Sequence, residues 1–194
     1  MATILLLLPG LVLLKLNVQF PAGMGDQEQI VLRWLHFVAG ITWVGLLYFF
    51  NLVNAPLLKA LDASTRGKVV PLLMPKALWW FRWAAVVTWL AGFRYFMILA
   101  KTDATNAGSP ALMWRWLGIW VVAWLVAFVI IHALLRPTQG VLNNGWMLAL
   151  LIGFVTLATA WLVLSLLGDP AAGGRTLSIS VGGGIGTIMF LNVW

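Results

Sequence analysis

A histidine inside an apolar run is the residue of this chain best suited to chemistry. His36 lies within Leu32–Phe50, a stretch long enough to cross a bilayer. Ionisable side chains at membrane depth are costly, and they tend to mark a cofactor, a proton path or a buried pair. His36, Gly40, Trp43 and Leu47 recur at helical spacing, so they share one face, on which Gly40 leaves room beside the imidazole.

The chemistry that this face indicates is haem ligation. An imidazole in a helix bundle is a common iron ligand. The chain has no cysteine, so a haem would be held non-covalently. We therefore take His36 as the candidate metal ligand, Gly40 and Trp43 as further candidate cofactor-binding residues, and haem b as the candidate cofactor. A His36 that only hydrogen-bonds a neighbouring carbonyl fits the same pattern equally well.

The composition places the chain in a membrane. Hydrophobic residues make up 62% of it, charged residues 9%, and the mean hydropathy is +0.98, whereas about a quarter of an average soluble domain is charged. The net charge of +7 does not indicate nucleic-acid binding, because Lys and Arg lie at the ends of apolar runs, as membrane topology favours. We predict an all-α, polytopic transmembrane helix bundle that forms a single integral membrane domain over residues 1–194.

Apolar windows long enough to cross the hydrocarbon recur along the chain and predict about five spans. Each span must be helical, because lipid offers no partner to an unpaired backbone amide. Residues 54–77 form the only linker with room for a surface helix. The predicted spans are residues 30–53, 78–99, 113–135, 146–167 and 177–194, with a short apolar helix over residues 1–20 that Pro9-Gly10 interrupts. The last span has no polar flank or cap, as expected of a sequence that continues.

The basic residues outside the spans lie mostly on one side of the membrane. We call the face at which the first predicted span begins the X face and the opposite one the Y face. The positive-inside bias makes Y cytoplasmic and places the His36 end at the periplasmic face of a bacterial-type inner membrane. The Y linkers hold Lys59, Arg66, Lys68, Lys76 and Arg136, against Lys101 and Arg175 at X.

Arginines and tryptophans near the predicted helix ends are expected at the membrane surface, where long basic side chains snorkel and indole rings sit at headgroup level. A tryptophan in mid-span needs a partner for its N–H, so we expect it to face other helices or a cofactor. The surface set is Arg33, Arg82, Arg94, Arg115, Trp34, Trp79, Trp80, Trp83, Trp114, Trp116 and Trp146; the mid-span set is Trp43, Trp89, Trp124 and Trp161.

The second histidine, His132, is not expected to share an iron with His36. At about 1.5 Å per residue, His36 lies about 9 Å from the X face and His132 about 6 Å from the Y face. Across about 30 Å of hydrocarbon, roughly 15 Å then separates them, whereas two imidazoles on one iron lie about 4 Å apart. We expect His132 at the interface. The second iron position is then expected to be vacant, or filled by a partner or by a weak ligand such as Met97.

Three groups of residues form an ordered set in the first, second and last main spans. They are Arg33-Trp34-Leu35-His36 through Gly40-Ile41-Thr42-Trp43-Val44-Gly45; Trp79-Trp80-Phe81-Arg82-Trp83 with Thr88-Trp89-Leu90-Ala91-Gly92-Phe93; and Gly186-Thr187-Ile188-Met189 with Asn192-Val193. The set resembles the membrane domain of PuuD-type urate hydroxylases. The first group alone, Leu-His followed by Trp-x-Gly, is also similar to the histidine helix of HemJ-type protoporphyrinogen oxidases and CopD-type copper proteins.

The resemblance implies a histidine pair near the X face that would clamp a haem, and this chain has half of it. His36 matches the first histidine of the family, but Ser180 occupies the position of the second. A glutamate in the family's second span corresponds to Ala84. Oxidation of urate by this chain alone is therefore not expected.

We hypothesise an accessory or electron-transfer subunit of a larger membrane redox complex, with haem b as the candidate cofactor and no enzyme activity of its own. Its expected partners are other membrane protein subunits and lipid, with a cytochrome c as a candidate and no nucleic acid. Two alternatives stay open. One is a membrane oxidoreductase of the urate or porphyrinogen type that uses a separate cytochrome c, and the other is a cofactor-free structural or assembly subunit.

Overall fold

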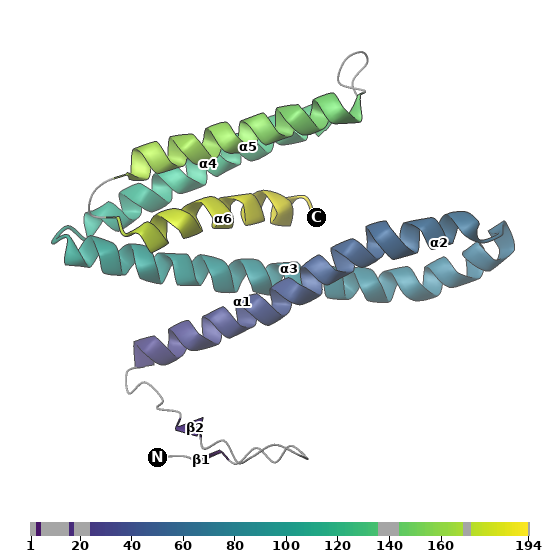
Figure 1. The fold of residues 1–194 in the computed structure, drawn as a ribbon, viewed down its shortest axis with the longest axis horizontal. Helices are drawn as coiled ribbons and strands as arrows, with labels where there is room; N and C mark the ends of the chain where they lie inside the picture. The colour runs from purple at the N-terminus through teal and green to yellow at the C-terminus, as the bar shows by residue number, and fades with distance from the viewer. Residues whose placement is uncertain (1–2, 5–15, 18–23, 136–143, 169–171, 194) are drawn as a thin grey trace.

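The computed structural model describes residues 3–4, 16–17, 24–135, 144–168 and 172–193. Within these ranges the chain is almost wholly helical, which confirms the predicted all-α bundle (Figure 1). Four helical stretches are long and apolar enough to cross a membrane, and they match the first four predicted spans. They are Gly25–Ala60, Ala63–Asn106, Ala111–Leu135 and Gly145–Leu167.

The first stretch is one continuous rod in three parts. Helix α1 runs from Met24 to Tyr48, the π-helical turn η1 covers Phe49–Asn54, and α2 covers Ala55–Ala60. A proline stands in the first turn of α2, and because proline has no N–H to donate, it fits where the hydrogen-bond pattern changes from π to α. The rod therefore runs past both ends of the predicted span 30–53.

The second stretch, α3, runs from Ala63 to Asn106. Its 44 residues make a rod of about 66 Å, roughly twice the hydrocarbon thickness. The chain reverses at Leu61 and Asp62, where the Asp62 carboxylate accepts from the Thr65 N–H at 3.0 Å and caps α3. Hydrogen bonds from Thr65 also lower the pKa of Asp62 below its usual value.

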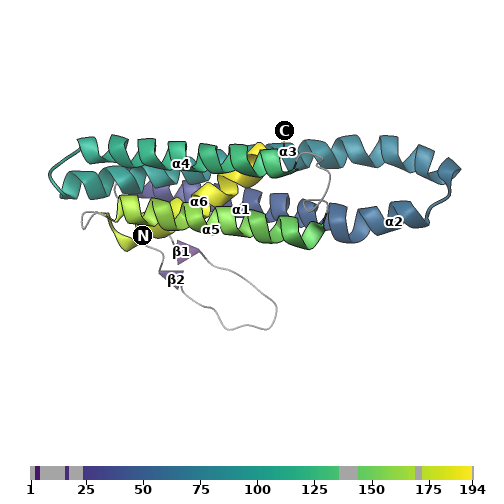
Figure 2. The same ribbon diagram turned by 90° about the horizontal axis from the view of Figure 1, so that it is seen from above.

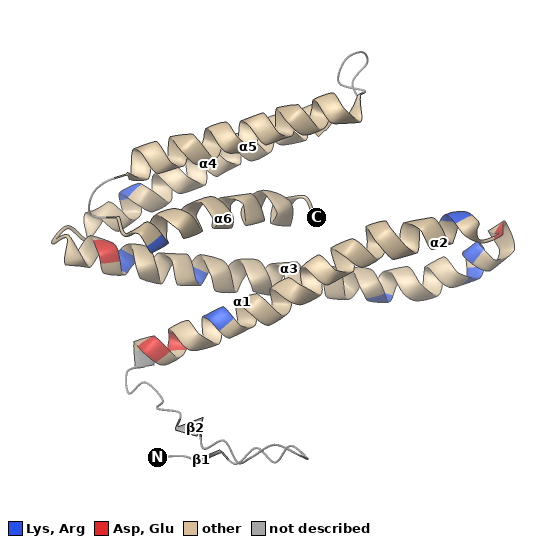
Figure 3. Cartoon of the chain, in the orientation of Figure 1, with Lys and Arg blue, Asp and Glu red and all other residues tan. Residues whose placement is uncertain are grey.

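The linker predicted over residues 54–77 is thus no separate surface element. Its residues end the first rod and begin α3, which stays helical through Pro71 and Pro75. Figure 3 shows Lys and Arg gathered at the far end of this helical hairpin, where α2 meets α3. The exposed basic residues there are Lys59, Arg66 and Lys68; Arg136, which we assigned to the same face, lies outside the described residues.

The remaining helices form a second hairpin and a short inner helix. Helix α4 runs from Ala111 to Leu135 and α5 from Gly145 to Leu167. Helix α6, from Gly174 to Leu191, begins three residues before the predicted fifth span. It contacts α3, α4 and α5. Figure 1 shows it between the two hairpins, and Figure 2 shows its oblique course. Among the described helices it is too weakly apolar to join the four membrane-crossing stretches.

The helix predicted over residues 1–20 lies mostly outside the described residues. The four residues described there pair as two antiparallel strands, β1 (Thr3–Ile4) and β2 (Leu16–Asn17), with Thr3 opposite Asn17. These four residues are therefore extended and not helical. A proline followed by glycine between them, at positions 9 and 10, opposes one continuous helix.

The tryptophans divide largely as predicted. Those expected at the surface are exposed except Trp116, which is 1% exposed because α4 packs against three other helices. Of the mid-span tryptophans, Trp43, Trp89 and Trp124 face other helices, as predicted. Trp161 does not face another described helix of this chain: it is 72% exposed, because α5 buries little of its surface in the bundle.

The hairpin tip and the opposite end of α3 should face opposite sides of the membrane. Because the chain has no cysteine, a single cysteine can be placed at either exposed site, as Ser64→Cys or Asn106→Cys. In intact cells we expect a membrane-impermeant maleimide to label only Asn106→Cys, and to reach Ser64→Cys after lysis. Labelling of both variants from one side would contradict the fold, and the reversed pattern would contradict the orientation.

Candidate functional site

His36 projects from α1 and is tied to α3. Its Nδ1 lies 2.8 Å from the carbonyl oxygen of Thr88. A carbonyl oxygen only accepts, so Nδ1 carries the proton and donates it, and in the neutral ring Nε2 then keeps a free lone pair. The residue is exposed, so a ligand can reach the ring from outside the α1–α3 pair.

The imidazole can reach the Thr88 carbonyl only because α3 has no side chain at Gly92. A Cβ at Gly92 would lie 2.8 Å from both Nδ1 and Cε1 of His36, closer than non-bonded atoms pack. The glycine on α1, Gly40, faces Thr88 with more space, since a Cβ there would lie 3.7 Å from the Thr88 Cγ2. Gly92 therefore sets the position of the ring more tightly than Gly40 does.

The other two candidate cofactor-binding residues share the face of His36, and this face is turned toward α3. Trp43 is 6% exposed and packs with Ala84 and Ala85. Gly40 lies beside Thr88. The structure therefore brings the three predicted residues together, but α3 covers Gly40 and Trp43, and a planar group on His36 would lie outside the helix pair.

Two arginines near the X end of α1 and α3 have partners within the protein. The Arg33 guanidinium lies over the ring of Tyr95, with Cζ 5.4 Å from the ring centre. The Arg94 Nε donates to the Glu28 carboxylate at 2.8 Å, and both side chains are about half exposed. Arg33 and Arg94 were predicted only to snorkel to the surface. Arg33 lies one turn before His36, where it offers a cation to a carboxylate-bearing ligand.

Four hydrogen bonds hold α6 against its neighbours. The Trp89 indole donates to the Thr187 hydroxyl at 2.8 Å, and the Trp120 indole donates to the Ser180 carbonyl at 2.7 Å. At the start of α6, the Asp103 carboxylate accepts from the Gly173 N–H at 2.9 Å. It also accepts from the Thr176 hydroxyl at 2.5 Å, and an acid at a helix N-terminus is favoured by the helix dipole.

None of these contacts was predicted from the sequence. Each joins residues at least 60 positions apart in the chain. No local spacing reveals such a pair. The only sequence signal was that mid-span tryptophans need an acceptor for the indole N–H.

The two positions at which the chain departs from the resemblance are both buried. Ser180 is 0% exposed; its hydroxyl donates to the Leu177 carbonyl at 2.6 Å, and its own carbonyl is taken by Trp120. Ala84 lies against Trp43 in a small apolar cluster. Neither position offers this chain a second iron ligand or an acid.

The two other residues considered as ligands do not join His36. His132 is exposed in the last turn of α4, with its ring centre 5.8 Å from that of Phe128. Met97 packs against the apolar core cluster that includes Phe96, Trp116 and Trp120. By helical spacing it lies on the face of α3 opposite Gly92. Among the described residues, no group of three or more His, Cys, Asp or Glu side chains could hold a metal ion.

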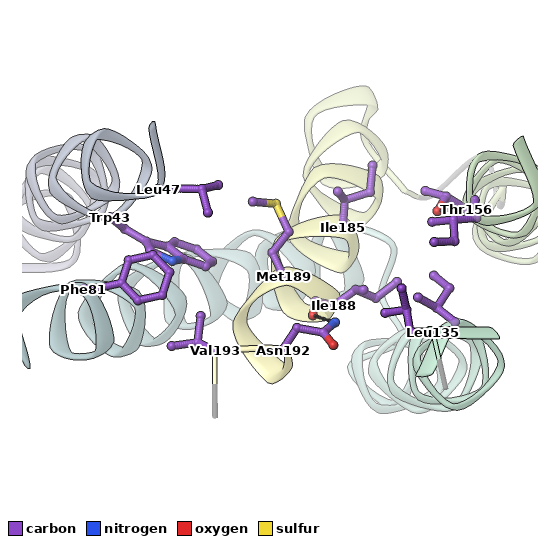
Figure 4. A pocket seen from close by; sticks show the side chains of 12 residues that line it. Trp43, Leu47, Phe81, Leu135, Thr156, Ile185, Ile188, Met189, Asn192 and Val193 are labelled. Carbon is purple, nitrogen blue, oxygen red and sulfur yellow. Dashed lines mark hydrogen bonds between the residues drawn. The ribbon is translucent and has the colours of Figure 1, made fainter. Parts of the chain in front are cut away.

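A separate cavity of about 400 Å³ lies toward the Y face, between the two hairpins. Figure 4 shows Trp43 and Phe81 at one side, Thr156 and Leu135 at the other, and Met189 of α6 between them. The lining is almost wholly apolar. Its volume is within the range of small-molecule sites, about 300–1,000 Å³.

The comparisons with known proteins gave one match. The sequence profile described as urate oxidase N-terminal matches residues 63–194, more than half of the chain. The matched segment begins with α3 and so leaves out α1 and His36. Neither the curated proteins nor the solved structures gave a match.

The close approach of α4 and α6 predicts an asymmetric response to alanine. A Cβ at Gly184 would overlap the indole of Trp124, which is 1% exposed, whereas a Cβ at Gly183 would lie 3.8 Å from Trp120 in ordinary contact. We expect Gly184→Ala to destabilise the bundle by about 1–3 kcal/mol and Gly183→Ala to change little. Thermal unfolding in detergent checks this, and equal midpoints for the two variants would contradict the α4–α6 contact.

Proposed function

This chain belongs to the urate oxidase N-terminal family, and from that premise we propose that it is an electron-transfer or accessory subunit of a larger membrane redox complex, with haem b held by His36. The observation that carries the proposal is the hydrogen bond from His36 Nδ1 to the Thr88 carbonyl. Iron-ligating histidines commonly donate the second ring N–H to a carbonyl, which fixes the tautomer and ring orientation and makes the other nitrogen a better ligand.

The surroundings of His36 fit a haem on the outer side of the α1–α3 pair. His36 is exposed, and Arg33 stands one turn away with a charge that suits a propionate. When bound there, haem b supplies one-electron redox chemistry. The protein's own part is to hold the imidazole: Thr88 accepts its proton-bearing nitrogen, and Gly92 leaves the space that this bond requires.

We propose that other membrane subunits and lipid cover the apolar outer faces of the bundle. The outward sides of α1 and α5 expose large apolar residues, among them Phe37, Ile41, Phe154 and Leu157. We also propose that the His36 end faces the periplasm of a bacterial-type inner membrane. Lys59, Arg66 and Lys68 gather at the hairpin tip, whereas the basic residues of the His36 end are accompanied by three acids, Asp26, Glu28 and Asp103. A separate cytochrome c is then a candidate redox partner on the His36 side.

A cofactor-free structural subunit is the second candidate. The same contact favours it, because a histidine that bonds a carbonyl on a neighbouring helix and fills the space over a glycine joins the two helices without a cofactor. The oxidoreductase alternative, acting on a purine or porphyrinogen substrate, has less support here, since Ser180 and Ala84 bring no titratable group to the matched segment.

The proposal predicts about one haem b per chain in gently solubilised protein, measured by a reduced-minus-oxidised spectrum and pyridine haemochrome. His36→Ala should remove it. Gly92→Ala should push the imidazole off the Thr88 carbonyl and weaken haem retention by about 10–100-fold, as is usual when a ligand loses its supporting partner. Gly40→Ala, on the facing helix, is the matched control and should retain haem.

Two results would decide against the ligand assignment. A His36→Ala variant that keeps all of its pigment would show that the haem is held elsewhere. A blank spectrum from a folded preparation, with α1 and α3 still paired, would favour the cofactor-free subunit.

A further inference from the structure

We propose that the cavity near the Y face binds the ring of a lipid-soluble quinone. The inference rests on the proposed electron-transfer function and names a small-molecule partner for it. The cavity is lined by α1, α3, α4, α5 and α6, so the tertiary fold alone assembles it. Trp43, which lines the cavity, follows His36 by two turns of α1, a rise of about 10 Å along the helix at 1.5 Å per residue.

The lining suits a flat apolar ring. Trp43 and Phe81 supply aromatic surface at one side, and Met189 supplies a thioether from α6 (Figure 4). Aromatic and thioether groups both make favourable contacts with flat rings. Because nearly all of the surface is apolar, a urate-like purine, which carries many hydrogen-bonding groups, would leave most of them unpaired.

Trp43 supplies the polar group that points to a ligand. The residue is 6% exposed and lines the cavity, and no hydrogen bond joins its indole N–H to another described residue. The indole N–H of Trp124 also lacks a partner among the described residues, but Trp124 does not line this cavity. The Thr156 hydroxyl already donates to the Ile152 carbonyl, and one N–H of the Asn192 amide donates to the Ile188 carbonyl, each at 2.8 Å. Among the described residues, the cavity therefore offers the Trp43 N–H and the second amide N–H of Asn192 to a ring that carries carbonyls.

The depth of Trp43 in the membrane favours a quinone over a phospholipid as the ligand. Trp43 precedes Val53, the end of the predicted span, by ten residues, which is about 15 Å of helix rise. The ester carbonyls of phospholipids lie at the boundary of the hydrocarbon, so at this depth a phospholipid brings only acyl chain. A quinone ring is soluble in hydrocarbon and brings carbonyl oxygens to the level of the indole N–H.

Two threonines on α5 provide a matched pair for the test. Thr156 lines this cavity, and Thr159 lines a different groove between α4 and α5. Both hydroxyls donate at 2.8 Å to the carbonyl four residues earlier, so replacing either with phenylalanine removes the same hydrogen bond. Only Thr156→Phe places a ring inside the proposed site.

The experiment measures binding of decylubiquinone to the full chain in nanodiscs, corrected for partition into empty nanodiscs, together with quinone extracted from the purified protein. We expect saturable binding at one site per chain, loss of that site in Thr156→Phe, and wild-type binding in Thr159→Phe. Trp43→Phe keeps the ring and removes the N–H, so it should weaken binding by up to about tenfold, the share of one hydrogen bond.

Binding that is not saturable, or equal binding by the two threonine variants, would overturn the proposal, as would co-purified phospholipid without quinone. The His36→Ala variant keeps this test separate from that of the haem. It should lose haem and keep the quinone site, so failure of one assignment leaves the other measurable.

Discussion

In a bilayer every polar group must find its partner within the protein, and this constraint shapes the whole chain. It makes the spans helical, and it turns hydroxyls such as those of Thr42 and Thr159 back to the carbonyl four residues earlier. It also sends the indole N–H groups of Trp89 and Trp120 across to α6. A donor left without an acceptor is therefore informative. Among the described residues, the indole N–H groups of Trp43, beside the cavity, and of Trp124, against α6, are such donors.

Helix α6 depends on its neighbours more than the longer helices do. It is short and rich in glycine, and an acid from α3 caps its start. The same glycines let the rings of Trp120 and Trp124 approach its backbone closely. Helix packing in membranes commonly depends on such contacts, in which small residues let the helices approach closely. Once α6 is fixed, its last turns form the middle of the apolar cavity between the hairpins.

The contact between His36 and Thr88 has two consequences at once. It joins α1 to α3 through a hydrogen bond between helices, at a level where the imidazole fills the space that Gly92 leaves. It also fixes which ring nitrogen carries the proton, so that the other is free to bind a metal. A histidine at membrane depth can thus be structural and functional together. Nδ1 joins the two helices in either case, and only the functional role uses Nε2, which would bind the metal.

The sequence by itself determined the all-α membrane fold, the first four spans and the shared face of His36, Gly40 and Trp43. Hydropathy and helical spacing can be read from short stretches of sequence. A stretch of apolar residues that crosses lipid must be helical here, because its backbone amides find no partners in lipid. Only the tertiary structure decided that this face meets α3, that Asp103 caps α6, and that five helices line one open cavity. Each of these depends on groups far apart in the chain, and the packing that joins them leaves no periodic signal in the sequence.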